Sequence, residues 1–187
     1  MSRQLEIIDT ALAGLKVVQR RLLVDARGYL ERMYCARELA SLTGGRPIAQ
    51  INHTLTTRRG VVRGMHFQHP PHGEIKLVSC LRGAVFDVAV DIRAGSPGLL
   101  RSHAEVLSAD NHRSLLIPAG FAHGFQALSD DVELLYLHTA AYAAEAEGGL
   151  NARDPALAIR WPEPITAMSE RDSAHPLLTG DFAGVRA

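Results

Sequence analysis

Cysteine is scarce in this sequence. Only Cys35 and Cys80 occur among the 187 residues, and neither stands in a Cys-x-x-Cys pair or beside a histidine. Two cysteines cannot form the disulfide framework of a small secreted scaffold, and their surroundings lack the spacing of a thiolate metal site. We therefore expect two ordinary reduced thiols, which favours a cytoplasmic location.

Long apolar runs and an excess of one charge are also absent. No stretch approaches the ~18 uninterrupted apolar residues of a membrane helix. Arg3 and Glu6 stand where a signal peptide would begin its apolar segment. Lys and Arg number 20, as do Asp and Glu, so the formal net charge is zero, whereas nucleic-acid binding usually needs a basic excess. We expect no membrane and no nucleic-acid partner, although a local basic pocket for a small anion fits this balance.

The composition is that of one globular domain. Apolar residues make up 47% of the chain and charged residues 21%, which is enough to bury a core and argues against disorder. The 16 glycines and nine prolines indicate many turns between short elements. No repeat or linker divides the chain. We expect a single domain over residues 1–187, with a core at about 47–140, an N-terminal arm at 1–46 and a C-terminal wrap at 141–187.

Short, regularly spaced strands dominate the pattern. In residues 84–93, apolar side chains such as Phe86 alternate with others such as Asp87, as on a half-buried strand. A short helix is expected at residues 36–42, where a Gly-Gly pair ends it. Strands at this spacing predict an all-β sandwich or barrel. Similar runs predict further strands at residues 61–67, 76–81, 103–107, 113–117, 124–128 and 132–139.

A basic cluster lies on two of these predicted strands. Alternation puts His66 and Gly64 on one face and Arg63 on the other, unless the strand bends at Gly64. Lys76 begins the next strand. His66 and Lys76 can therefore face one cavity, or they can be two basic side chains on the outer surface of a sheet.

A tight turn precedes a second candidate histidine. The pattern Pro118-x-Gly120-x-x-His123 resembles the second motif of the cupin family, although Ala127 stands where that motif ends in asparagine. The resemblance implies a jelly roll, or double-stranded β-helix, with short flanking helices and a pocket inside the barrel.

This sequence lacks part of the set of metal-ligand residues that many cupins have. The His-x-His of the first cupin motif is missing, because His66 is followed by Phe67-Gln68-His69. An iron or zinc site needs three or four well-placed ligands, so we expect no metal. No GxGxxG or Walker loop indicates a nucleotide cofactor either. Tyr136, on one face with Leu134 and His138, adds a hydroxyl to the remaining pocket residues.

A longer set of segments resembles the dTDP-4-dehydrorhamnose 3,5-epimerase family of nucleotide-sugar enzymes. These segments follow in family order and with similar spacing from about residue 25 to residue 178. They comprise residues 27–31, 50–53, 59–68, 76–78, 83–93, 117–125, 159–162 and 168–172.

The resemblance implies a role for each matching residue. His66 resembles the catalytic base, Asp172 the carboxylate that pairs with it, Tyr136 the general acid and Lys76 the cation near the C4 oxygen of the sugar. Arg63 resembles a phosphate contact. The remaining positions that resemble substrate-binding residues are His123, Glu31, Gln50, Asn52, Arg27 and Tyr142. The family's segment at residues 29–31 reaches the neighbouring subunit's site, which implies a homodimer.

The chemistry agrees with these implied roles. A ketone at C4 acidifies the hydrogens on C3 and C5, and an enolate that is reprotonated on the opposite face has an inverted centre. The reaction needs a base, an acid and a cation at the enolate oxygen, and no cofactor. The resemblance thus implies epimerisation at C3 and C5 of a nucleotide-linked 4-keto-6-deoxy sugar, of the dTDP-4-dehydro-6-deoxyglucose type.

Several positions depart from the family pattern around the substrate. The common Trp-Asn-Asp-Pro reads Ala152-Arg153-Asp154-Pro155, the basic residue after the tyrosine is Leu137, a common Gln is Glu74, and the paired tyrosines become Ala141-Tyr142. Epimerisation of a single centre, C3 or C5, and a dTDP-, CDP- or GDP-linked substrate therefore stay open. A metal-dependent cupin and a non-catalytic sugar-binding cupin are further alternatives.

Overall fold

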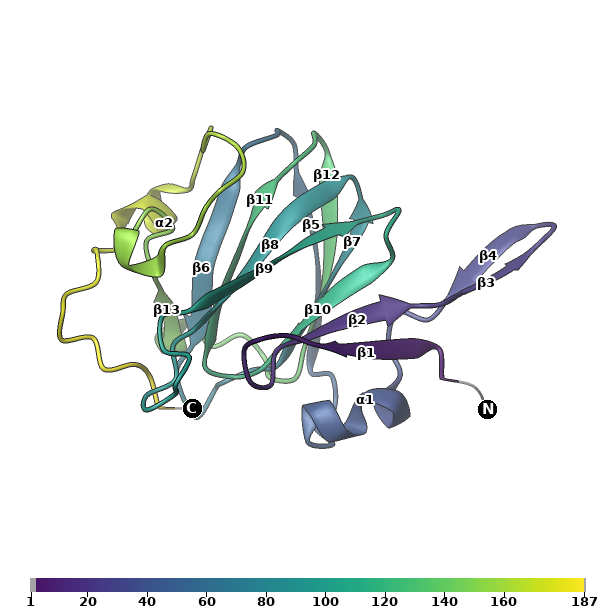
Figure 1. Cartoon of the computed structure of the whole chain (residues 1–187), viewed down its shortest axis with the longest axis horizontal. Coiled ribbons are helices and arrows are strands. Elements are labelled where there is room, and N and C mark those ends of the chain that lie inside the picture. Colours follow the sequence, from purple (N-terminus) through teal and green to yellow (C-terminus); the bar gives the residue numbers. More distant parts are fainter. Residues whose placement is uncertain (1–2, 187) are drawn as a thin grey trace.

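Two antiparallel β-sheets face each other across the body of the protein (Figure 1). The computed structural model describes residues 3–186. The six-stranded sheet contains, in spatial order, β1 (Leu5–Asp9), β2 (Lys16–Arg20), β10 (Arg113–Ile117), β7 (Lys76–Arg82), β12 (Val132–His138) and β5 (Gln50–Thr56). The five-stranded sheet contains β13 (Glu147–Gly149), β6 (Val62–Gln68), β11 (Phe121–Ala127), β8 (Ala84–Asp91) and β9 (Ser102–Ser108).

The predicted all-β jelly roll is confirmed. The strand at 113–117 has the predicted bounds, and those at 61–67, 76–81, 84–93, 103–107 and 132–139 differ by one or two residues at an end. Only β11 begins well before its prediction, at Phe121, because the tight turn before it delivers the chain directly into the sheet. Side chains from both sheets, among them Leu115, Phe125 and Leu134, form a buried core between them. The apolar side chains of the alternating pattern therefore point into the space between the two sheets.

The N-terminal segment contributes to the sheet, a helix and a hairpin. β2 pairs antiparallel with β10, and β1 pairs with β2 at the edge of the six-stranded sheet, so this sheet continues beyond residues 47–140. The predicted helix is confirmed as α1 (Ala36–Thr43), which ends at Gly44 in the left-handed conformation. Its Leu39 is fully buried against one end of the sheet. Between β2 and α1 in the chain, β3 (Leu22–Asp25) and β4 (Gly28–Glu31) form a hairpin that projects away from the body of the protein (Figure 1).

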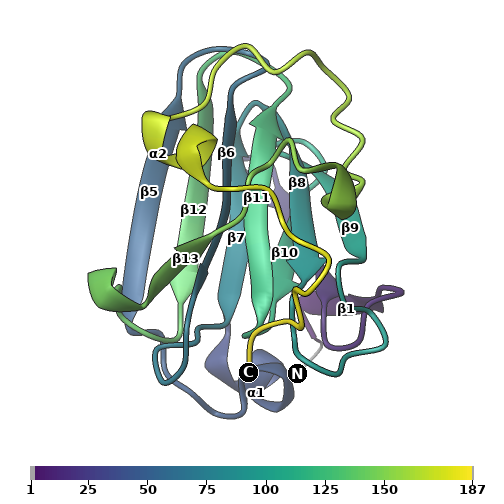
Figure 2. The same cartoon turned by 90° about the vertical axis from the view of Figure 1, so that its left-hand side faces the viewer.

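The C-terminal segment runs back over the outer face of the five-stranded sheet (Figure 2). It contains two short 3-10 turns, η1 (Ala144–Ala146) and η2 (Pro155–Leu157), and the helix α2 (Glu170–Ala174). Leu150, Leu157 and Trp161 pack with Val62 and Met65 in a second apolar cluster. No helix among residues 3–186 is long and apolar enough to cross a bilayer.

The strand β6 bends at Gly64, and this bend decides which side chains face inward. Gly64 has a φ of 122°, and a Cβ there would lie 2.7 Å from the carbonyl oxygen of His123. The register between β6 and β11 shifts beside it. Arg63 and His66 consequently both face the interior cavity, while Met65 packs into the outer apolar cluster. The sequence placed Arg63 and His66 on opposite faces unless the strand bends at Gly64. That bend is present, so the two side chains share a face and simple alternation does not hold here.

Candidate active site

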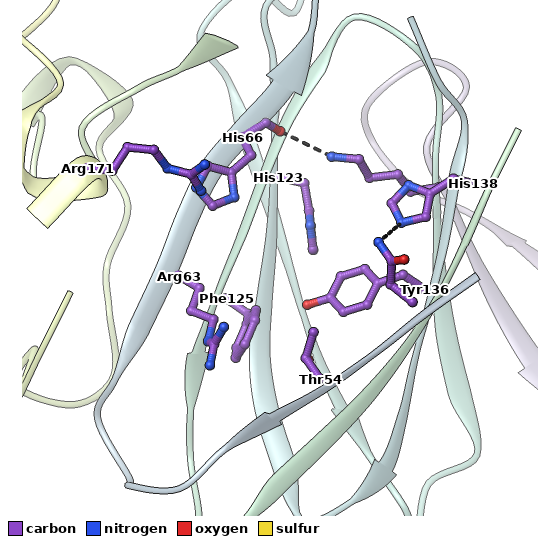
Figure 3. Close-up of a pocket in the computed structure, with 10 residues that line it drawn as sticks. Thr54, Arg63, His66, His123, Phe125, Tyr136, His138 and Arg171 are labelled. Carbon is purple, nitrogen blue, oxygen red and sulfur yellow. Dashed lines mark hydrogen bonds between the residues drawn. The ribbon is translucent and has the colours of Figure 1, made fainter. Parts of the chain in front are cut away.

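A cavity of about 310 Å³ lies between the two sheets, inside the barrel (Figure 3). Five strands, β5, β6, β7, β11 and β12, and the helix α2 supply its wall. Its lining residues are Asn52, Thr54, Arg63, His66, Lys76, His123, Phe125, Tyr136, His138 and Arg171. Imidazole, ammonium, guanidinium, phenol and amide groups thus converge on a space the size of a small ligand site.

His66 and Asp172 form a hydrogen-bonded pair on one side of this cavity. The ring Nε2 of His66 lies 2.8 Å from Oδ1 of Asp172, and the other carboxylate oxygen accepts the N–H of Gly64 at 3.0 Å. The hydroxyl of Ser169 caps α2 by accepting the N–H of Asp172, so it fixes where the helix begins and places Asp172 in its first turn. A carboxylate only accepts hydrogen bonds, so Nε2 carries the hydrogen and Nδ1 is left as the basic nitrogen.

Asp172 is held in its charged form. Its side chain is 3% exposed. Burial by itself would raise the pKa of this carboxyl group, but the hydrogen bonds from His66 and from the Gly64 N–H outweigh burial and bring the pKa well below its usual range. An ionised carboxylate therefore faces His66 at neutral pH, where it would stabilise an imidazolium.

Tyr136 lies on β12, the strand that faces His66 across the cavity. Figure 3 shows its hydroxyl pointing into the cavity. Its ring meets the ring of His123 edge-on, with 6.0 Å between centroids, and lies nearly parallel to the ring of His138. Burial, with a smaller contribution from the charge of Asp87, raises the pKa of Tyr136 far above its ordinary value. The phenol therefore keeps its proton and is a donor.

Lys76 connects the two walls of the cavity. Its ammonium lies 3.1 Å from Glu74 and donates to the main-chain oxygen of His66 at 3.3 Å. Glu74 also bonds Nδ1 of His138, at 2.7 Å. Burial alone would raise the pKa of Glu74, but the His138 hydrogen bond and the charge of Lys76 bring it below its ordinary value. Glu74 is therefore a buried carboxylate shared by two pocket residues.

His123 has a carboxylate partner of its own. Its Nε2 lies 2.8 Å from Oδ1 of Asp87, and both side chains are almost fully buried. The second oxygen of Asp87 has no hydrogen-bond partner within residues 3–186. Over the same residues, no three His, Cys, Asp or Glu side chains gather as a metal site would require. The carboxylates near the cavity are instead paired with single imidazoles or with the lysine.

The structure places the predicted site residues in three locations. His66, Lys76, Tyr136, Arg63, His123 and Asn52 line the cavity, and Asp172 touches it through His66. Gln50 lies beside Asn52, at 3.1 Å, and accepts the main-chain N–H of Tyr142. Arg27 and Glu31 lie outside the cavity of this chain, on the projecting hairpin. Arg27 pairs with Asp25 and Glu31 with Arg20.

Sequence reasoning missed several residues that the fold brings to the cavity. Arg171 precedes Asp172 on α2, and its guanidinium lies 3.3 Å from the His66 ring while also bonding Glu147. Thr54 follows Asn52 by two residues, so alternation on β5 could have found it. His138 shares a face with Tyr136 in the same way. Phe125 follows His123 by two residues and completes this group.

A jelly-roll barrel that encloses buried imidazole–carboxylate pairs and a phenol defines a cupin-type enzyme whose cavity holds groups able to take up and release protons. The model of the family described as dTDP-4-dehydrorhamnose 3,5-epimerase matches residues 9–180. The chain belongs to this family of carbohydrate epimerases.

Individual relatives agree with this assignment. A dTDP-4-dehydrorhamnose 3,5-epimerase of Sinorhizobium fredii is 41% identical over 169 residues, which cover 90% of this chain and 87% of that protein. A dTDP-6-deoxy-D-glucose-3,5-epimerase of Legionella pneumophila, solved in complex with dTDP-4-keto-L-rhamnose, superposes with a TM-score of 0.89 at 37% identity, covering 98% of both chains. A dTDP-4-dehydrorhamnose 3-epimerase of Streptomyces niveus is 41% identical over 82% of this chain and 74% of its own length.

Proposed function

We propose that this chain epimerises dTDP-4-dehydro-6-deoxyglucose at C3 and C5 to give dTDP-4-dehydrorhamnose, without a cofactor. One observation carries the proposal: the His66–Asp172 pair and the Tyr136 hydroxyl lie on opposite walls of one cavity, with Lys76 beside them. The family and the named activities of the relatives support the same reaction and the same substrate class.

His66 is the proposed base. Its hydrogen-bonded Nε2 leaves Nδ1 to take a proton from C3 or C5, and the charged Asp172 stabilises the imidazolium that forms. This arrangement supplies proton abstraction on one face of the sugar.

Tyr136 and Lys76 complete the proposed proton transfer. The neutral phenol returns a proton to the other face, which inverts the centre. The ammonium of Lys76 holds the C4 oxygen as it becomes an enolate, and an electrostatic contact of this kind lowers a barrier by about 3–4 kcal/mol in an enclosed site. His123 contributes to the wall against which the sugar packs.

The diphosphate has guanidinium partners at the mouth. Arg63 and Arg171 both line the cavity, and the planar guanidinium fork matches phosphate oxygens. Gln50, Asn52 and Tyr142 form a hydrogen-bonded group beside it, which we assign to the nucleotide and sugar hydroxyls.

We also propose a homodimer in which the β3–β4 hairpin completes the partner's site. The hairpin carries Arg27 and Glu31 and exposes apolar side chains that its own chain leaves uncovered: Leu23, Val24, Tyr29 and Leu30. A projecting ribbon with such a surface is suited to pack against a second copy. Mixing the inactive variants His66→Ala and Arg27→Ala tests this idea, because a hairpin acting across the interface restores activity in mixed dimers, whereas one acting within its own chain does not.

A cytoplasmic location is part of the proposal. Cys35 and Cys80 are both free thiols in the structure, in keeping with a reducing compartment. Fractionation of cells that express the chain with its natural ends would test it, and recovery outside the cytoplasmic fraction would contradict it.

Exchange with solvent tests the reaction directly. Incubation with dTDP-4-dehydro-6-deoxyglucose in heavy water should place deuterium at C3 and at C5, as read by NMR and mass spectrometry. His66→Ala should abolish exchange at both positions, while His72→Asn, an exposed histidine outside the cavity, should not. Tyr136→Phe should impair inversion more than exchange. Absence of exchange with dTDP-, CDP- and GDP-linked 4-keto sugars alike would refute the proposal.

A single-centre epimerase is the second candidate. It is favoured by the named 3-epimerase activity of the Streptomyces niveus relative, which matches as closely in identity as the 3,5-epimerases do. Deuterium at C3 without deuterium at C5 would establish that reaction instead.

A further inference from the structure

Thr54 places a buried hydroxyl in the wall of the cavity. Its Oγ1 is shielded from water and has no hydrogen-bond partner within residues 3–186, although polar groups line the space beside it. Burying a hydroxyl without a partner is unfavourable, and most buried polar atoms in proteins are hydrogen-bonded. An exception in the wall of a reaction cavity indicates a hydroxyl that finds its partner during the reaction.

The strand register brings Thr54 next to Tyr136. In the antiparallel pair of β5 and β12, Asn52 lies opposite Tyr136. Thr54 lies opposite Leu134, two residues away on each strand. Thr54 and Tyr136 are therefore diagonal neighbours on the cavity side, a separation that an aromatic side chain can bridge. Figure 3 shows Thr54 beside the Tyr136 hydroxyl, which points into the cavity.

The phenol of Tyr136 needs a stabilising neighbour to act as an acid. Burial, with a smaller contribution from the charge of Asp87, raises its pKa far above the ordinary value, because a buried phenolate loses its hydration. The Thr54 hydroxyl and the positive charge of Arg63 act in the opposite direction and lower the pKa of Tyr136. Arg63 acts through its charge, whereas a hydroxyl next to the phenolate oxygen can donate a hydrogen bond to it.

We propose that Thr54 is a positioning residue for the acid: its hydroxyl donates a hydrogen bond to the Tyr136 oxygen and stabilises the phenolate that forms during inversion. The proton moves from the phenol oxygen to C3 or C5, where the electron pair of the enolate forms the new C–H bond. The electron pair of the broken O–H bond stays on the Tyr136 oxygen, and Thr54 keeps its own hydrogen. Tyr136 regains a proton from solvent before the next inversion. Catalytic hydrogen bonds are often poorly formed before substrate binds and tighten in the reacting complex. This inference rests on the proposed epimerase reaction.

Two substitutions separate the hydroxyl of Thr54 from its shape. Thr54→Val keeps the branched shape and removes the hydroxyl, whereas Thr54→Ser keeps the hydroxyl and removes the methyl group. Because a hydrogen bond to a charged oxygen is a strong one, Thr54→Val should slow inversion about 10- to 100-fold. Deuterium exchange through His66 should stay within about threefold of the native rate. Thr54→Ser should keep both rates within about threefold.

Thr56→Val is the matched control. Thr56 is also on β5, and its hydroxyl is likewise buried without a hydrogen-bond partner among the residues that the structure describes, but it does not line the cavity. Its loss should leave both exchange and inversion at the native rate. Affinity for dTDP, measured by calorimetry, should be the same in all three variants, which also shows that each is folded.

A more acidic phenol provides a readout that a loss of packing would not change. Replacing Tyr136 by a fluorotyrosine makes the phenol a stronger acid, whose phenolate needs less stabilisation. In the Thr54→Val background this replacement should raise the rate of inversion at least threefold, because the weaker demand for a hydrogen bond offsets the missing hydroxyl.

Each result decides the role of Thr54. Native inversion in Thr54→Val would overturn the inference, as would an equally large loss in Thr54→Ser or a loss that the fluorotyrosine does not relieve. A loss that follows weaker dTDP binding would make Thr54 a contact of the substrate and would also overturn it. If the native chain exchanges deuterium with no nucleotide-linked 4-keto sugar, the proposed function itself fails.

Discussion

Replacing Asp172 by asparagine should slow proton abstraction about a thousandfold while leaving the fold intact. The amide has nearly the same shape, and its oxygen can still accept the N–H of Gly64. Its NH₂ group would then face Nε2 of His66, where the carboxylate now accepts at 2.8 Å. A donor in that place favours the tautomer with its hydrogen on Nδ1, which is the nitrogen the reaction needs as a base.

The magnitude follows from the lost ion pair. With about 4 Å between charge centres and an effective dielectric of about 20, the carboxylate stabilises the imidazolium by about 4 kcal/mol. Each 1.4 kcal/mol changes a rate about tenfold, so kcat should fall by about 10³. The side chain of Asp172 is 3% exposed, so water does not replace the missing charge.

Solvent exchange and the affinity for dTDP together provide the assay. Deuterium incorporation at C3 and C5 measures abstraction alone, and the Kd for dTDP, which lacks the reacting sugar, should stay the same. A loss below tenfold in Asp172→Asn, or a loss explained by weaker dTDP binding, would refute this reasoning.

Other predictions concern the lysine, the bend in β6 and acid stability. Lys76→Met should lower kcat by about 10²- to 10³-fold without weakening dTDP binding, which steady-state kinetics and calorimetry check. Gly64→Ala should destabilise the protein by more than about 2 kcal/mol, because its Cβ would meet the His123 carbonyl and the backbone of the next strand at a positive φ; urea unfolding measures this, and an unchanged midpoint would contradict it. The lowered pKa of Asp172 adds stability that is fully present above the unfolded value of about 4 and is lost as pH falls below it. Asp172→Asn should therefore flatten the acid side of the stability profile, as followed by thermal melting from pH 7 to pH 3.

Local pattern in the sequence was sufficient for the strands between residues 61 and 139 and for the first helix. Alternating side chains predicted β7, β8, β10 and β12 to within two residues at either end, because in-and-out alternation is a property of the strand itself. The helix at residues 36–43 ends where its glycine pair permits a left-handed turn. The Pro118–Gly120 turn placed His123 at the start of an inward-facing strand for the same local reason.

Tertiary contact decided the site. The bend at Gly64 turns Arg63 and His66 to one face, and it depends on the close approach of β11 rather than on the sequence of β6 alone. Asp172 reaches His66 across more than 100 residues of chain because the C-terminal segment packs its apolar side chains onto the outer sheet. Glu74, two residues before β7, meets His138 because β7 and β12 are neighbours in the sheet and pair Lys76 with His138. Periodicity reports the conformation of a segment, whereas these pairs depend on which segments the buried apolar surfaces bring together.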